Sequence, residues 1–230
     1  MVAQELPILH FRLGRLGEVG GRVGNCGRLL LSCRGMSDPV LAVFEATGAY
    51  LRGHFRLTSG LHSPEYLQCA KVLQYPVHAA AFGTALGRQF AAMAGGKKID
   101  AVVSPAMGGL IIGHEAARAL DCRFVFTERD ATGQMTLRRG FAIEPGETVV
   151  VVEDVITTGG STREVIGILD GCGATVLGAG SIIDRSGGQA DVGVSRIALA
   201  TLQVTAWEPE SCPLCQQGLP VIKPGSRNVV

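Results

Sequence analysis

The sequence has little excess charge of either sign. Across 230 residues, 21 lysines and arginines face 20 aspartates and glutamates, which leaves a formal net charge of +1. A nearly neutral chain excludes nucleic-acid binding that is driven by an extended basic surface. It also has no stretch long and apolar enough to cross a bilayer. We therefore expect partners that are neither nucleic acids nor membranes.

The sequence also lacks the cysteine pattern of a disulfide-stabilised protein. Its seven cysteines are odd in number and irregularly spaced, so we expect a reduced, soluble protein of the cytoplasm. Cys212 and Cys215 form a single CxxC pair, whereas two such pairs would indicate structural zinc. We interpret this pair as reduced, structural or incidental, and a third and fourth ligand from another cysteine or a histidine stay open. The histidines have no catalytic or metal-binding spacing, and we interpret His62 as structural.

Three familiar chemical motifs are missing. There is no GKS or GKT of a Walker A loop and no GxGxxG dinucleotide fingerprint. No nucleophile with a matching base is evident, which separates the chain from hydrolases of the Ser/His/Asp or Cys/His kind. The hydrophobic fraction of 47% is nevertheless enough for a sizeable core.

The first 35 residues differ in composition from the remainder. They hold five arginines against two glutamates, and seven glycines interrupt every possible periodic run. Met36 is followed by SDPVLAVFEATGAYL, which predicts a helix capped by Ser37 or Asp38 with Pro39 in its first turn. We expect Met36 to be the natural start, residues 1–35 to be a disordered extension or a mis-assigned start, and residues 36–230 to form one domain.

Within residues 36–230, apolar runs alternate with helical patterns. This alternation predicts an α/β fold with a parallel sheet flanked by helices. Helices are expected over 76–94, 109–120 and 161–170. Strands are expected over 54–59, 66–69, 101–104, 123–127, 148–152, 174–183 and 197–204. Residues 54–68 and the C-terminal tail would form a small hood over the strand ends.

The segment VVVVEDVITTGGST, residues 149–162, is the most informative part of the chain. It predicts a buried strand that ends in Glu153 and Asp154, followed by a loop of small and hydroxylated residues and the start of a helix. Free N–H groups and the helix dipole at such an N-terminus favour a phosphate. Paired carboxylates beside it suit the hydroxyls of a sugar, or a metal ion held against them. A ligand that needs both features is a phosphorylated ribose.

This segment resembles the phosphoribosyl-pyrophosphate loop of the type I phosphoribosyltransferases. Two further stretches are similar to those of the orotate phosphoribosyltransferases in that family. HFRLTSGLHSPEYLQ, residues 54–68, resembles their orotate-side segment, and FTERDATGQMTLRRGF, residues 126–141, resembles a compact form of their mobile catalytic loop. PAMGG at 105–109 and IIDRSGG at 182–188 occur in the expected order. The resemblance covers nearly all of residues 36–230.

The resemblance implies a type I phosphoribosyltransferase-like fold with a small hood subdomain. It implies transfer of 5-phosphoribosyl from phosphoribosyl pyrophosphate to orotate in pyrimidine biosynthesis. It also implies a homodimer, and Mg²⁺ that is chelated by the substrate and has no direct protein ligand. Two alternatives stay open: a purine or another base as the acceptor, and a regulator that senses phosphoribosyl pyrophosphate without turnover.

The resemblance also assigns residues to the reaction. Glu153, Asp154 and Arg129 are the catalytic candidates, and Thr157 and Arg185 are the orotate contacts. Phosphoribosyl pyrophosphate is assigned to Glu153, Asp154, Val155, Ile156, Thr157, Thr158, Gly159, Gly160, Ser161, Arg129, Arg138 and Arg139.

Each assignment has a plainer alternative. The acids could be a solvated pair at a strand end, and the loop could be an ordinary helix cap. Residues 128–140 could be a β-hairpin with a solvated basic face. Arg185 could form a surface salt bridge to Asp184 or Asp191.

The chain departs from the family pattern at two positions. Many relatives carry a lysine where this chain has Gly108, and another where it has Thr58. The loop at 128–140 also lacks the usual lysine and histidine residues. We therefore expect Arg129, Arg138 and Arg139 to supply the charge that binds pyrophosphate, with Arg129 as the first candidate.

Overall fold

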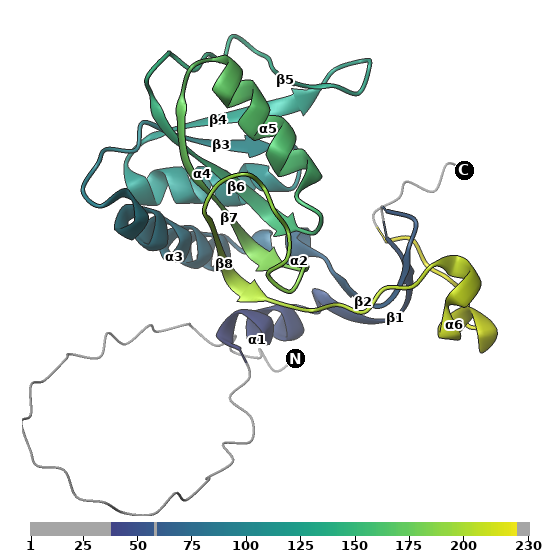
Figure 1. The fold of residues 1–230 in the computed structure, drawn as a ribbon. Coiled ribbons are helices and arrows are strands. Elements are labelled where there is room, and N and C mark those ends of the chain that lie inside the picture. The colour runs from purple at the N-terminus through teal and green to yellow at the C-terminus, as the bar shows by residue number, and fades with distance from the viewer. Residues whose placement is uncertain (1–37, 58, 225–230) are drawn as a thin grey trace, which may run out of the picture.

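A computed structural model of the chain describes residues 38–57 and 59–224 (Figure 1). The expectations for residues 1–35 and for Thr58 fall outside this range. Within it, the chain forms a six-stranded sheet with helices on both faces and a separate two-stranded sheet. No helix in the described part is long and apolar enough to cross a membrane.

The six-stranded sheet has the order β5-β4-β3-β6-β7-β8. Its strands are parallel except β5, which runs antiparallel to β4. The predicted parallel sheet is therefore confirmed, with one antiparallel strand added at its edge. The strand bounds are β3 (Ala101–Pro105), β4 (Arg123–Arg129), β5 (Met135–Leu137), β6 (Thr148–Ile156), β7 (Thr175–Asp184) and β8 (Arg196–Thr201).

The two faces of the sheet are covered by different helices. Successive valines of β6 point to opposite faces: Val150 and Val152 belong to the core that contains α3 and α4, and Val149 and Val151 to the core beneath α5. Figure 1 shows α5 on one side of the sheet and α3 with α4 on the other. The bounds are α1 (Pro39–Ala46), α2 (Cys69–Leu73), α3 (Pro76–Ala94), α4 (Gly109–Leu120) and α5 (Gly160–Gly171).

Element bounds agree best where the local signals were strong. α3 and α4 have the predicted limits, and α3 ends at Gly95 in the left-handed conformation. The first helix ends earlier than predicted, at Ala46, because a turn at Thr47 and Gly48 leads directly into the next strand.

The hood contains a hairpin of β1 (Tyr50–Arg56) and β2 (His62–Leu67). The predicted strands, 54–59 and 66–69, were displaced toward the C-terminus, because cross-strand pairing already begins at Tyr50 with Leu67. The tail, which contains the short helix α6 (Pro213–Gln216), returns to this hairpin. Trp207 bridges to His62, and Ile222 bridges to Phe55. The predicted combination of hairpin and tail is therefore present.

The strand order places a switch point between β3 and β6. From β3 the chain moves to β4 and β5 on one side, then returns to β6 on the other side of β3. In open α/β sheets, ligands bind outside the carboxyl ends of strands at such a point. The strand of the segment 149–162, which is β6, has its carboxyl end at this switch point.

Candidate functional site

Glu153 and Asp154 lie inside β6 rather than at its end. The predicted strand stopped at Val152, but β6 continues to Ile156 because β7 pairs with it that far. Its other neighbour, β3, pairs with β6 only as far as Val151. The two acids therefore lie beyond the last residue that pairs with β3, at the switch point.

The two carboxyl groups are half-buried and lack a cationic partner among the described residues. Burial, followed by the adjacent Asp154, raises the pKa of Glu153 to about 9. Burial also raises the pKa of Asp154, whose Oδ1 accepts a hydrogen bond of 2.8 Å from the Val155 N–H. The alternative of two solvated acids does not agree with this burial. The pair instead offers acceptors for hydroxyl groups or for a cation.

The loop before α5 is held in a fixed shape. Gly159 adopts φ 75° at the N-cap, and a Cβ there would lie 2.6 Å from Cγ1 of Val192, so no other residue suits the position. Arg163 donates through Nη1 to the carbonyl oxygens of Thr158, at 2.8 Å, and of Asp191. No side chain caps α5. The alternative of an ordinary helix cap is therefore wrong, and the first N–H groups of α5 have no side-chain acceptor.

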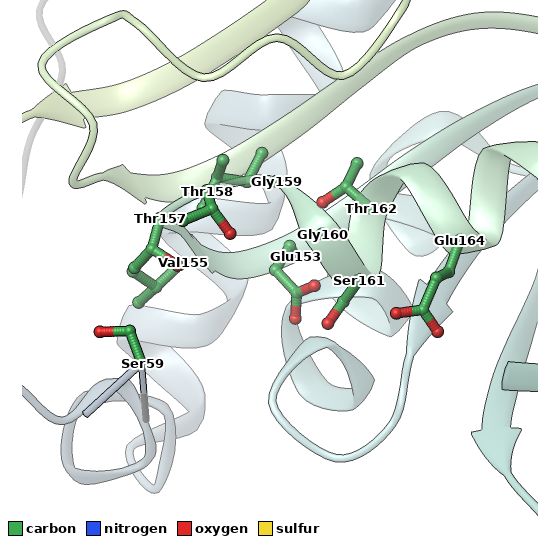
Figure 2. Close-up of a pocket in the computed structure, with 11 residues that line it drawn as sticks. Ser59, Glu153, Val155, Thr157, Thr158, Gly159, Gly160, Ser161, Thr162 and Glu164 are labelled. Carbon is green, nitrogen blue, oxygen red and sulfur yellow. The ribbon is translucent and has the colours of Figure 1, made fainter. Parts of the chain in front are cut away.

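A cavity of about 330 Å³ opens over this loop (Figure 2). In Figure 2, the carboxylate of Glu153 and the hydroxyl of Ser161 point in the same direction, and Ser59 of the hood faces Val155. The cavity thus combines a helix N-terminus, hydroxyl groups and one of the paired acids. It is lined by Ser59, Glu153, Val155, Ile156, Thr157, Thr158, Gly159, Gly160, Ser161, Thr162 and Glu164.

A second cavity, of about 490 Å³, lies between the hood and the sheet. The hood contributes apolar and aromatic side chains, including Leu57, Leu61 and Tyr66, and the sheet side contributes Asp154 and Arg185. Both cavities are lined by Ser59, Val155, Thr157 and Thr158. A ligand with a phosphate in the first cavity can therefore place a planar ring in the second.

Arg185 follows β7 and enters this second cavity. Its backbone N–H donates to the Ile156 carbonyl at 2.8 Å, and burial lowers the pKa of its guanidinium. The buried Nε has no hydrogen-bond partner within the described residues. Asp184 instead pairs with Arg196 and accepts from Ser186. The alternative of a salt bridge from Arg185 to Asp184 is therefore wrong.

Residues 128–137 form a hairpin of β4 and β5, so the hairpin alternative describes the structure of this segment. Arg129 is the last residue of β4, and Arg138 and Arg139 follow β5. Arg129 donates from Nη1 and Nη2 to both carboxylate oxygens of Glu164, at 2.9 and 3.0 Å. Arg139 is held in the same bidentate manner by Glu128. Arg138 is exposed. Glu164 also lines the first cavity, the one over the loop. Of the three arginines, Arg129 is therefore the one that an ion pair connects to this cavity. Its role in binding pyrophosphate stays a prediction.

Gly108 has a structural reason to lack a side chain. It lines a cavity with Asp154 at the turn between β3 and α4, and a Cβ at this position would lie 2.5 Å from Oδ1 of Asp154. A lysine here would displace that carboxylate. The glycine at position 108, where the resemblance led us to expect a lysine, is therefore coupled to the position of Asp154.

Sequence reasoning missed four residues of this region. Ser59, Tyr66 and Glu164 line the cavities, and Arg163 holds the loop. Ser59 and Tyr66 lie in the orotate-side segment 54–68, so that segment was the available signal for them. Arg163 and Glu164 face the site only because α5 turns them there, and no local pattern indicates this.

Comparison with known proteins agrees with this geometry. The family model described as "Phosphoribosyl transferase domain" matches residues 83–210. An orotate phosphoribosyltransferase of Pelotomaculum thermopropionicum is 55% identical over 192 residues, which is 84% of this chain and 98% of the relative. One from Heliobacterium modesticaldum is 51% identical over 192 residues, which is 83% of this chain and 98% of the relative.

A solved structure supports the same relationship. The crystal structure of orotate phosphoribosyltransferase from Aeropyrum pernix superimposes with a TM-score of 0.59 at 29% identity, and the match covers 71% of this chain and 94% of that one. Its fold and the sequence similarity to the two bacterial relatives lead to one conclusion. The chain belongs to the orotate phosphoribosyltransferase family of the type I phosphoribosyltransferases.

Proposed function

We propose that this chain transfers the 5-phosphoribosyl group from phosphoribosyl pyrophosphate to N1 of orotate. The products are orotidine 5′-phosphate and pyrophosphate, in the synthesis of UMP. The observation that carries the proposal is that the cavity over the loop and the cavity between hood and sheet adjoin each other. An uncapped helix N-terminus beside paired carboxylates opens directly onto a pocket that contains the partly buried Arg185.

The 5′-phosphate binds at the N-terminus of α5. The loop of Thr157, Thr158, Gly159, Gly160 and Ser161 supplies N–H and hydroxyl donors, with Val155 and Ile156 forming the wall behind them. This binding energy is far from the reacting carbon and serves to orient it. Glu153 and Asp154 accept hydrogen bonds from the ribose 2′- and 3′-hydroxyls.

The reaction breaks the bond between the anomeric carbon and the pyrophosphate oxygen and forms a bond to N1 of orotate. Positive charge develops on the ribose ring, and the carboxylate of Asp154 stabilises it. Arg129, with Arg138 and Arg139, binds the departing pyrophosphate and helps to exclude water from the ring. No protein nucleophile takes part.

Orotate binds in the cavity between the hood and the sheet. The guanidinium of Arg185, whose Nε has no hydrogen-bond partner among the described residues, donates to the carboxylate and ring carbonyl groups of orotate, and Thr157 contacts the base from the loop. Leu57, Leu61 and Tyr66 cover the planar ring. These contacts distinguish orotate from a base that lacks the carboxylate.

The site also suits Mg²⁺ that is held through the substrate. Glu153 and Asp154 have no ion pair within the described part of the chain, and burial raises the pKa of both. A cation coordinated by ribose oxygens would favour the ionised form of both carboxyl groups. When bound, Mg²⁺ neutralises the charge of the pyrophosphate leaving group.

The proposal includes a homodimer that works in the cytoplasm. Met107, in the turn before α4, and Ile111, in the first turn of α4, are 80% and 46% exposed and give this face an apolar character that suits a second copy. None of the five cysteines among the described residues forms a disulfide, which agrees with a reducing compartment.

A base-specificity assay tests the proposal. The loss of orotate absorbance is followed after addition of phosphoribosyl pyrophosphate and Mg²⁺, with hypoxanthine, adenine and uracil in parallel reactions. Turnover with orotate alone is expected. Turnover with another base instead of orotate would show that this base is the acceptor. Binding of phosphoribosyl pyrophosphate without turnover of any base would favour a regulator that senses this compound.

A further inference from the structure

The hood contains a cluster of metal-ligating side chains that the phosphoribosyl transfer does not use. His54 of β1 and His62 of β2 meet Cys212 and Cys215, which flank the start of α6. Their four ligand atoms lie within 4.8 Å of one another. From the sequence we interpreted His62 as structural and the CxxC pair as reduced, structural or incidental, because a single CxxC pair does not by itself indicate zinc. A third and fourth ligand stayed open. Figure 1 shows β1, β2 and α6 close together, away from the six-stranded sheet.

We propose that these four residues form a structural zinc site of the Cys₂His₂ type. Zinc in such a site is tetrahedral, with bonds of about 2.0–2.1 Å to nitrogen and about 2.3 Å to sulfur, so its ligand atoms lie about 3.3–3.8 Å apart. His54 Nε2 lies 3.5 Å from Cys212 Sγ and 3.7 Å from Cys215 Sγ. His62 Nδ1 lies 3.2 Å from Cys215 Sγ and 2.9 Å from His54 Nε2. The widest separation in the cluster is at most 4.8 Å, so one ion in the centre reaches all four atoms after side-chain shifts of up to about 1 Å.

The orientation of His54 points independently to a ligand. Its Nδ1 lies 2.8 Å from the Leu219 carbonyl oxygen, which can only accept a hydrogen bond. The proton of the neutral ring is therefore on Nδ1, and the lone pair of Nε2 points into the cluster. Metal-binding histidines are held in this way by an acceptor on the other ring nitrogen.

The charges of the cluster also balance around zinc. Cys212 and Cys215 each lose a thiol proton to solvent when they bind, and the two thiolates with two neutral imidazoles compensate the charge of Zn²⁺. The resulting site is neutral, so it can be enclosed: His54, His62 and Cys212 are buried, and Cys215 lies at the surface. Four protein ligands leave no open position for water, which is the arrangement of structural rather than catalytic zinc.

The hood has few other means of holding its tail. Of residues 50–67 and 202–224, excluding Thr58, only Phe55, Leu67 and Cys212 are buried hydrophobic residues. Apart from the cluster and the His54 contact with Leu219, the tail contacts the hairpin through one bridge to each strand, at Trp207 and Ile222, and through the Ser63 hydroxyl, which donates to the Thr205 carbonyl oxygen. A unit this small cannot build an adequate core, and metal ions commonly replace one. The ion would fix the hairpin that carries Leu57, Leu61 and Tyr66 over the second cavity.

The proposal is tested by metal analysis of the full chain. The protein is purified without a chelator and without a metal-affinity column. Elemental analysis is expected to find about one zinc per chain. Cys212→Ser and His54→Ala should each lose it, whereas Cys122→Ser, a half-buried cysteine outside the cluster, should keep it. This readout does not require transferase activity, so it remains decisive even if the proposed reaction is wrong.

A second measurement on the unaltered chain covers the case that these variants do not fold. Protein stripped of metal and loaded with Co²⁺ should show the intense visible absorption of tetrahedral cobalt together with a thiolate-to-cobalt charge-transfer band. Absence of both zinc and this spectrum would overturn the site. So would a disulfide between Cys212 and Cys215 in freshly purified protein, detected by the mass after alkylation.

Discussion

A Cβ atom on Gly108 would lie 2.5 Å from Oδ1 of Asp154, which is closer than a Cβ can approach an oxygen. At the switch point, the turn after β3 therefore packs so closely against Asp154 of β6 that no side chain fits between them. This relationship makes Gly108 a means of disturbing Asp154 without altering the acid itself.

We predict that Gly108→Ala lowers kcat/KM by about tenfold or more, because a displacement of the carboxylate by less than 1 Å is enough to disrupt its alignment. Steady-state kinetics with both substrates measure this. Gly167→Ala in α5 is the matched control, since no atom lies within 4 Å of a Cβ there. Equal rates for the Gly108 variant and the wild type would show that the carboxylate position is not critical.

Asp154→Asn should reduce kcat/KM by about 100-fold or more, because the amide retains the shape of the side chain but loses the charge that stabilises the ribose cation. Its acceptor oxygen can still receive the 2.8 Å hydrogen bond from Val155, so the fold should persist. Asp170→Asn, at the exposed end of α5, should leave the rate unchanged. A nearly wild-type rate for the Asp154 variant would sink its catalytic assignment.

Arg129 should be released from Glu164 when pyrophosphate is present. The two side chains are 46% and 44% exposed, so the pair contributes at most about 1 kcal/mol and can be exchanged for a phosphate contact. We predict that Arg129→Ala lowers kcat/KM for phosphoribosyl pyrophosphate by about tenfold or more, whereas Glu164→Ala preserves it. Arg118→Ala, which removes an exposed pair on α4, is the control. Equal losses in the Arg129 and Glu164 variants would mean that the pair is structural.

Arg185→Lys should raise the KM for orotate by about tenfold while leaving the KM for phosphoribosyl pyrophosphate nearly unchanged, because an ammonium group cannot reproduce the planar fork of donors. Initial rates with each substrate varied in turn separate the two constants. Arg88→Lys on the exposed side of α3 serves as the control. If both constants rose together, Arg185 would be supporting the site rather than contacting the base.

The raised pKa of Glu153, about 9, predicts a pH-dependent stability. A carboxyl group with a folded-state pKa above its ordinary value of about 4.3 favours the folded state most at low pH, and this contribution is lost as the pH rises toward 9. Relative to the wild type, Glu153→Gln should therefore gain stability between pH 5 and 9, by about 1 kcal/mol or more.

Chemical unfolding at several pH values, without substrate, measures that difference. Glu144→Gln, an exposed glutamate on the loop before β6, should show no such trend. A difference between wild type and Glu153→Gln that did not change with pH would contradict the raised pKa.

Local signals were sufficient for several elements. α3 and α4 could be predicted to the residue because Pro76 and Gly95 delimit one helix, and a buried strand with a short turn precedes the other. The hood strands were misplaced because their limits depend on pairing with each other and with the tail rather than on their own residues.

The ion-pair partners of the charged residues could not be predicted from the sequence. The bidentate contacts of Arg129 with Glu164 and of Arg139 with Glu128 join different elements. Their partners depend on how α5 and the hairpin pack, which no local pattern encodes. The same limit applies to Arg185, because Asp184, its partner in the plainer alternative, is paired with Arg196.

By itself, the sequence determined the strand, the paired acids, the loop and the helix of 149–162, because these features follow one another along the chain and depend on local geometry. Only the tertiary structure decided that β6 continues past β3 and leaves Glu153 and Asp154 at the switch point. It likewise brought His54 and His62 to Cys212 and Cys215. Contacts between residues so distant in sequence arise from the packing of whole elements, and packing is a property of the folded chain rather than of any segment.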